Sequence, residues 1–490
     1  MNTPLRRVGV TMLVMVVLLL ANVTYIQMVK ADDYRTDGRN LRVLYDEYAR
    51  QRGQIVTEVG GQVLAGVDPS NDRYKFTRTY VNGPLYAPVT GYYSVRYGAG
   101  GMERAEDEVL NGSDPRLLVR RLSDMITGRD PRGGNVQLSI VPKVQQAAYD
   151  LMTKRGYTGS VVAMDPKTGA ILGMVSTPSY DPNKLASHDG KAQGQAWSGF
   201  DQDPNKPMLN RAIQETYPPG STFKLVTAAA GLENGLVKPD TPINTAPNVK
   251  LPGTNVTLEN YGGAACQGTT FKDALAHSCN VPFAELAGAL GKDKLSRTAA
   301  NFGIGKTDLT VPMRVATSGL GDLAGQPQLF QSGIGQRDVR LTPLQDCLLA
   351  ATVANGGIAM KPYLVKKLLA PDLSDIETFG PEQLTGDPAL SPENAKILKD
   401  LMIASEANTK GGGKRGDLTI ASKTGTAEHS NDPKNTAPHA WYTGFAPAED
   451  PKVAVAVIVE SGGNRGLEAT GGTVAAEIGR AAINAALGGG

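Results

Sequence analysis

A serine and a lysine one helical turn apart carry the first chemical signal in the sequence. The run Pro218-Pro-Gly-Ser221-Thr-Phe-Lys224 precedes an apolar stretch, so Ser221 is predicted to lie in the first turn of a buried helix. Residues three apart share a helix face, which places the Ser221 hydroxyl beside the Lys224 amine. A desolvated lysine has a lowered pKa and can take a serine proton, so the pair fits a nucleophile and its base. The alternative is a solvated helix start, because Ser-x-x-Lys also occurs by chance.

Two more motifs follow in the chain, Ser278-Cys279-Asn280 and Lys423-Thr-Gly-Thr426. The second ends a stretch whose alternation predicts a strand, and its glycine leaves room for an extended peptide to pair along the edge. Either motif alone is more often a helix cap or a surface strand. In this order, however, the three motifs match the set of β-lactamases and penicillin-binding proteins, with cysteine in place of the central aspartate of Ser-Asp-Asn.

With these motifs the chain resembles the class B penicillin-binding proteins, the monofunctional D,D-transpeptidases of bacterial cell-wall synthesis, and most of all their actinobacterial members. The resemblance covers essentially the whole chain. Outside the catalytic motifs it includes Arg52-Gly-Gln-Ile55, Leu209-Asn-Arg-Ala212, Thr342-Pro-Leu-Gln345 and Trp441-Tyr-Thr-Gly-Phe445. It implies an α+β fold: a penicillin-binding transpeptidase domain like a serine β-lactamase, with an antiparallel sheet and a large helical part, behind an N-terminal anchor and a β-rich pedestal domain.

The resemblance also implies a role for each polar residue of the first two motifs. Ser221 attacks the penultimate D-Ala carbonyl of a stem pentapeptide and forms an acyl-enzyme, while Lys224 takes the serine proton. Ser278 relays a proton to the leaving nitrogen, with Lys423 nearby. Asn280 holds the acyl side-chain amide and supports Lys224. The alternative is structural: Lys224 as a hub bonded to Asn280, and Ser278 as a helix cap.

The third motif is implied to bind substrate. The Thr424 and Thr426 hydroxyls, on either side of Gly425, bind the terminal carboxylate, and the backbone N–H groups of Ser221 and Thr426 are the oxyanion donors. The acyl group then passes to an amine on a neighbouring stem peptide. β-Lactam antibiotics are trapped because their acyl-enzyme resists hydrolysis.

Other functions are weighed against this one. A D,D-carboxypeptidase or a β-lactamase would use the same motifs, but the deacylating glutamate of class A β-lactamases has no counterpart pattern here. A scaffold that recruits a membrane glycan polymerase through residues 8–135 is the alternative from another class. Such a polymerase is expected as a partner in either case.

Composition and residue spacing argue against nucleic-acid binding and against a metal site. Lys plus Arg number 50 and Asp plus Glu 48, a net charge of +2, so no basic surface for nucleic acid is expected. Four histidines and three cysteines show no metal-ligand spacing, and we expect no metal or cofactor.

The pattern of elements predicts how these motifs are carried. Short strands and turns fill the region before residue 135, and a strand, turn and strand follow it from Ser160 to Val175. Strands at Ala440–Phe445 and Val453–Glu460 lie beyond a long helical middle, which favours an antiparallel sheet with a helical insertion. The predicted units are residues 1–30, a cytoplasmic tip and anchor; 31–135, a pedestal resembling a dimerisation domain; and 136–490, the transpeptidase domain.

The uncharged stretch from Val8 to Val29 is long enough to cross a bilayer, since ~1.5 Å per residue spans roughly 30 Å. A cleaved signal peptide is the alternative, although its apolar region is usually shorter. Arg6 and Arg7 precede the stretch, and Asp32, Asp33 and Asp37 follow it. This asymmetry predicts a single-pass membrane protein whose catalytic domain is extracytoplasmic.

A disulfide between Cys266 and Cys279 is predicted for such an outward-facing domain. Cys279 lies between two residues expected to point into the site, so its own side chain should point away, towards the loop that contains Cys266. Cys347 falls in an apolar, helix-like run where a buried free thiol is ordinary. Two unpaired thiols at 266 and 279 remain the alternative, because one sequence does not show that their Cα atoms come within ~7 Å.

Overall fold

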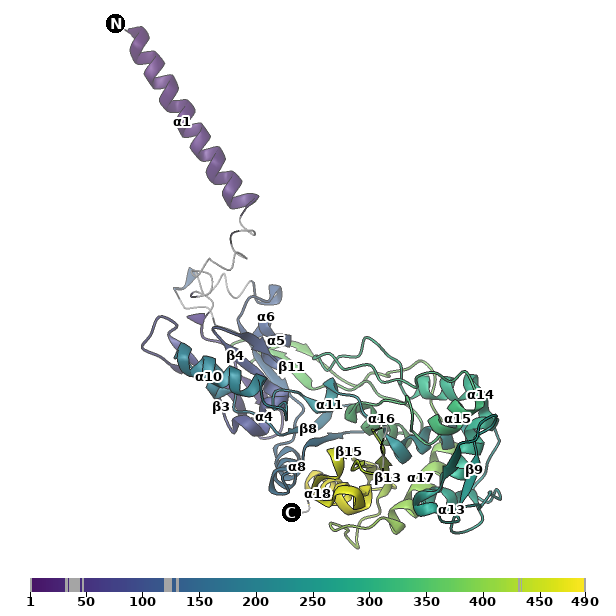
Figure 1. Ribbon diagram of the computed structural model, residues 1–490. Helices are drawn as coiled ribbons and strands as arrows, with labels where there is room; N and C mark the ends of the chain where they lie inside the picture. The colour runs from purple at the N-terminus through teal and green to yellow at the C-terminus, as the bar shows by residue number, and fades with distance from the viewer. Residues whose placement is uncertain are drawn as a thin grey trace.

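The computed structural model describes residues 2–30, 34, 45, 48–118, 126–128, 132–430, 432 and 434–488. Two sheets organise the molecule, and a long N-terminal helix, α1 (Asn2–Met28), extends away from both of them (Figure 1). The predicted α+β architecture is confirmed.

The sheet that carries the third motif is five-stranded and antiparallel. Its strand order is β13 (Ala421–Ala427), β14 (His439–Ala446), β15 (Val453–Val459), β7 (Gly159–Met164) and β8 (Ile171–Thr177). Strand β15 pairs with β7, so a strand near the end of the chain lies beside the first strand of the transpeptidase segment. The predicted antiparallel sheet with a helical insertion is therefore present, and β13 lies at its edge.

The strands β7 and β15 are apolar on both faces, and helices cover both. On one face Val162, Ala454 and Ala456 join the core of α16 (Pro343–Ala354). On the other, Val161 and Val455 pack with α8 (Pro142–Lys154) and α18 (Ala476–Ala486), seen beside β15 in Figure 1. The alternation follows from the two-residue period of a strand.

The inserted helices lie between β8 and β13 and carry the first two motifs. The longer ones are α10 (Gly190–Asp201), α12 (Lys224–Glu233), α14 (Val281–Asn301) and α17 (Pro392–Asn408). Shorter ones are α9 (Asn183–Ala186), α11 (Arg211–Gln214), α13 (Phe271–Ala276) and α15 (Gln326–Ser332). A small hairpin, β9 (Asn248–Lys250) and β10 (Thr257–Glu259), lies between α12 and α13.

The pedestal is built on a six-stranded sheet to which distant parts of the chain contribute. Its order is β12 (Asp375–Thr378), β11 (Val365–Leu369), β6 (Asn135–Leu138), β1 (Ile55–Thr57), β2 (Val63–Pro69) and β3 (Phe76–Tyr80). The hairpin β4 (Tyr92–Ser94) and β5 (Gly98–Gly100), α4 (Gly83–Thr90), α5 (Met102–Ala105) and α6 (Asp107–Leu110) accompany it. The predicted boundary near residue 135 falls at the first residue of β6, and β11 and β12 return to this sheet from the later segment.

Helix α1 is exposed along its length, and residues Thr3–Met28 are long and apolar enough to cross a membrane once. Arg6 and Arg7 lie near its start. The predicted acidic flank, Asp32, Asp33 and Asp37, lies outside the described residues.

Candidate active site

Ser221 lies in a tight 3-10 turn, Gly220–Phe223, that continues directly into α12 at Lys224. The turn is held against the sheet by close backbone contacts. Gly220 has φ +55° and a Cβ there would lie 2.6 Å from the Thr426 carbonyl oxygen, so only glycine fits without strain. The Trp441 indole donates to the Pro218 carbonyl at 3.0 Å, which fixes the loop before the turn. Ser221 is half-buried, whereas the rest of the turn and α12 to Leu232 are buried.

Strand β13 brings the third motif to the serine turn. Lys423 pairs with Thr443 of β14, so its backbone is fixed by the sheet. A Cβ on Gly425 would lie 2.6 Å from the Pro219 carbonyl oxygen, and this is why a glycine stands between the two threonines. Thr424 and Thr426 share one face of the strand and are both partly exposed. They therefore lie on one face of an edge strand, next to the turn that carries Ser221, and a strand at the edge of a sheet can pair with an extended peptide.

The second motif occupies the turn between α13 and α14. Ser278 has φ +59°, a left-handed conformation that a non-glycine residue keeps only when its surroundings impose it. Asn280 is the N-cap residue, directly before α14. The turn places both side chains towards the two lysines, as the following contacts show.

The ε-amine of Lys224 joins the first two motifs. It donates to the Ser278 carbonyl and to Asn280 Oδ1, both at 2.7 Å, and lies 3.5 Å from Ser278 Oγ. A neutral amine has two N–H groups and one lone pair. Because two carbonyl oxygens take the N–H groups, the lone pair of a neutral Lys224 is left to accept a proton. In the part of the chain that the structure describes, no hydrogen bond engages the Ser221 hydroxyl.

The amine of Lys423 joins the third motif to the second. It donates to Ser278 Oγ at 2.7 Å and to the Thr424 carbonyl at 2.9 Å. Ser278 thus lies between the two lysines, and all three motifs meet around its side chain and carbonyl.

Both lysines are fully buried, and within the described ranges neither forms an ion pair with a carboxylate. Burial lowers the pKa of Lys224 well below its ordinary value, and the neighbouring Lys423 lowers it further. Burial lowers the pKa of Lys423 to about 7. A pair of lysines without a counter-charge can hold a neutral amine near neutral pH, which is what a base for serine requires.

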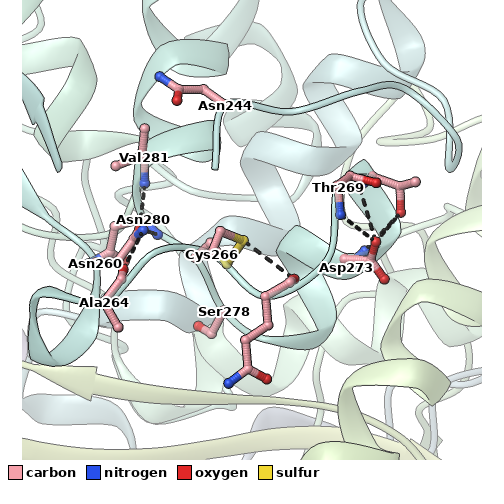
Figure 2. Close-up of a disulfide and its surroundings, with 12 residues drawn as sticks. Asn244, Asn260, Ala264, Cys266, Thr269, Asp273, Ser278, Asn280 and Val281 are labelled. Atoms are coloured by element: carbon pink, nitrogen blue, oxygen red, sulfur yellow. Dashed lines mark hydrogen bonds between the residues drawn. A yellow bond between two sulfur atoms is a disulfide. The ribbon is translucent and has the colours of Figure 1, made fainter. Parts of the chain in front are cut away.

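A disulfide joins Cys266 to Cys279 directly behind the second motif, with Cα atoms 5.6 Å apart (Figure 2). This is the pairing predicted from the sequence, and Cys347 is a buried free thiol. The bridge ties the turn at Ser278 to the loop that follows β10.

One support of the site was not predicted. Glu406, at the end of α17, accepts hydrogen bonds from Ser422 Oγ and from Arg480 Nε, the latter at 2.8 Å. Arg480 also donates to the carbonyls of Gly411 and Gly412 at 2.8 and 2.9 Å. This buried pair holds β13 and the preceding glycine loop from behind the catalytic face. The sequence signal for this pair is Arg480 itself, a lone arginine in the largely apolar helix α18.

Two known protein families match parts of the chain. Residues 159–484 match the penicillin binding protein transpeptidase domain, and residues 52–136 match the penicillin binding protein A dimerisation domain. The peptidoglycan D,D-transpeptidase PbpA of Mycolicibacterium smegmatis is 56% identical over 99% of both chains. That of Mycobacterium tuberculosis is 51% identical, again over 99% of both chains.

Solved structures agree. The ceftriaxone acyl-enzyme complex of penicillin-binding protein A from M. tuberculosis has 50% identity and a TM-score of 0.88, covering 90% of this chain and all of that one. The D,D-transpeptidase domain of a peptidoglycan glycosyltransferase from Eggerthella lenta has 28% identity and a TM-score of 0.74, covering 90% and 98%.

Proposed function

The chain belongs to the class B penicillin-binding proteins, and we propose that it is a peptidoglycan D,D-transpeptidase in which Ser221 is the nucleophile. The observation that carries the assignment is the meeting of three motifs around Ser278, with Lys224 and Lys423 both donating hydrogen bonds to it. Each residue role below extends that proposal.

In the acylation step, neutral Lys224 takes the Ser221 proton as Ser221 Oγ bonds to the penultimate D-Ala carbonyl carbon. The backbone N–H groups of Ser221 and Thr426 stabilise the resulting oxyanion. The C–N bond then breaks, and the proton passes from Lys224 through Ser278 to the leaving nitrogen. Terminal D-Ala departs and an ester to Ser221 remains.

In the second step, an amine of a neighbouring stem peptide attacks the ester carbonyl. Its N–C bond forms, the bond to Ser221 Oγ breaks, and the amine proton returns to Ser221 through the same groups. A β-lactam follows only the first step. Its leaving nitrogen stays attached to the opened ring, so the acyl-enzyme persists.

The substrate is held along β13. Thr424 and Thr426 donate their hydroxyl protons to the terminal carboxylate, and Lys423 contributes positive charge beside them. Asn280 Nδ2 and Oδ1 are already engaged by Glu259 and Lys224, so we assign Asn280 first to holding Lys224 and then to the acyl side-chain amide.

The surroundings of the enzyme follow from α1. With Arg6 and Arg7 on the cytoplasmic side, the helix anchors the chain once and leaves the catalytic domain outside the membrane. The pedestal then holds the site away from the bilayer and offers a surface for a membrane glycan polymerase.

The test is to incubate the full chain with a fluorescent penicillin and to identify the labelled peptide by mass spectrometry. We expect the label on Ser221 and none in Ser221→Ala. Labelling that persists in that variant, or that maps to Ser278, would contradict the assignment.

A further inference from the structure

The start of helix α14 has an unusual arrangement. The first N–H groups of a helix have no partner within it. The side chain of the N-cap residue, directly before the helix, normally accepts a hydrogen bond from one of them. Asn280 holds this position but makes no such bond. Its amide is used elsewhere: Oδ1 accepts from Lys224 and Nδ2 donates to the Glu259 carbonyl, each at 2.7 Å.

Another asparagine, 20 residues earlier in the chain, binds the backbone at this end of the helix. Asn260 Oδ1 accepts from the backbone N–H of Asn280 at 2.7 Å and from that of Val281 at 3.0 Å (Figure 2). The next residue, Pro282, has no N–H. One side-chain oxygen therefore serves the two N–H groups that precede Pro282.

Asn260 is itself firmly held. It is 6% exposed, and its Nδ2 donates to the carbonyls of Ala246 and Ala264 at 3.0 and 3.1 Å. Its hydrogen-bonding capacity is thus filled by backbone groups of the segment around the β9–β10 hairpin and of α14. The disulfide from Cys266 to Cys279 ties the same segment to the turn one residue before Asn280.

We propose that Asn260 is a positioning residue that binds the two backbone N–H groups at the start of α14 and so holds the Asn280 amide against Lys224. Without the Asn260 oxygen, the N–H groups of Asn280 and Val281 lose their acceptor, and the backbone at Asn280 is no longer fixed. A shift of this backbone moves Asn280 Oδ1 away from the Lys224 amine. The inference rests on the proposed function, in which Lys224 is the base for Ser221.

The first test is the rate of Ser221 acylation by a fluorescent penicillin in the full chain carrying Asn260→Ala. We expect the acylation rate to fall about 10- to 100-fold. This is the range found when the hydrogen-bond partner that orients a metal-ligating residue is removed. Asn244→Ala is the matched control, because Asn244 lies in the same segment and donates to Glu285 on the exposed surface of α14. It should acylate at the unchanged rate.

A double-variant cycle separates positioning from loss of structure. If Asn260 acts through Asn280, Asn260→Ala should cost less than about 3-fold in a chain that already carries Asn280→Ala, because the two changes remove one interaction. The slow rates are followed by intact-protein mass spectrometry. Effects that multiply would overturn the proposal.

The pH profile adds a further readout. Loss of the Asn280 contact in Asn260→Ala should move the acid limb of acylation to lower pH, because an acceptor that stabilises the ammonium of Lys224 is lost.

The outcomes are distinct. An unmoved pH profile in Asn260→Ala would refute the positioning role. Labelling of Ser221 at the full rate in Asn260→Ala would refute it too and leave the proposed function intact. Labelling of another residue in every variant would instead overturn the proposed function.

Discussion

Two of the buried clusters of charged side chains in the described part of the chain are built on opposite principles. In the pedestal, Glu103 is fully buried between two arginines, with Arg52 Nε at 2.7 Å and Arg78 Nε at 2.6 Å. Tyr80 donates to the same carboxylate at 3.1 Å. Burial by itself would raise the pKa of Glu103, but the two arginines outweigh it and hold the pKa below its ordinary value.

In the active site, Lys224 and Lys423 are as deeply buried but have only neutral acceptors, and their pKa values fall. Compensated charge fixes a structure, whereas an uncompensated pair leaves an amine neutral and a site attractive to an anion. We infer that the substrate carboxylate provides the negative counter-charge for the two lysines, as Glu103 does for the two arginines of the pedestal.

The largest expected effect comes from Lys224→Met, which keeps the length of the side chain but removes the amine. Acylation of Ser221 by a fluorescent penicillin should fall by at least ~10² to 10⁴, the usual contribution of a general base. The free energy of unfolding should change little, because relief from burying an amine opposes the loss of hydrogen bonds to Ser278 and Asn280. A rate near that of the unchanged chain would remove Lys224 from the mechanism.

Glu103→Gln should produce the reverse pattern. Arg78 would lose its carboxylate partner and Arg52 would keep only the ion pair with the partly exposed Asp107, at a cost of ~3 to 5 kcal/mol in the free energy of unfolding. Because the pKa of Glu103 is depressed in the folded state, its contribution is present above the ordinary glutamate pKa of ~4.3 and is lost as the pH falls through the folded value. Denaturant unfolding at pH 7 and pH 3.5 measures both.

The matched control for that substitution is Glu382→Gln. Glu382 pairs with Lys361 at 2.8 Å on the surface, where a salt bridge is worth ~0 to 1 kcal/mol. Acylation by the folded Glu103→Gln chain should match that of the unchanged chain. Equal stability of the two glutamine variants would show that the pedestal cluster does not stabilise the fold.

The sequence predicted the catalytic motifs because their spacing is local. Ser221 and Lys224 lie one turn apart, and alternation up to Ser422 predicted a strand at the third motif, where the observed strand β13 begins at Ala421 and continues to Ala427. It did not predict the supports, since neither the bonds of Asn260 to the start of α14 nor the pair of Arg480 with Glu406 follows from a local pattern. The return of β11 and β12 to the pedestal sheet is equally non-local, and β6, which begins at the predicted boundary, also belongs to that sheet.

The next prediction tests the missing counter-charge. Replacing both Thr424 and Thr426 by valine removes two hydroxyl donors with almost no change in volume. Each hydrogen bond to a charged group is worth ~1.5 to 3 kcal/mol, so the second-order rate of acylation by penicillin should fall strongly. Thr378→Val, on the exposed strand β12, is the control. An unchanged rate in the double variant would mean that the carboxylate binds elsewhere.

The smallest expected effect is a shift in the pH dependence of acylation. It tests whether the lysine pair lacks the counter-charge that the pedestal cluster has. Burial lowers the pKa of Lys423 to about 7, so the second-order rate of acylation, which reports the free enzyme, should fall as the pH rises through that value and the positive charge is lost. At saturating penicillin the carboxylate stabilises the ammonium, and the alkaline limb should move to higher pH. Lys423→Arg should abolish the limb at both concentrations, because arginine stays protonated. An alkaline limb that is the same at low and saturating penicillin would show that the bound carboxylate is not the counter-charge of this lysine pair.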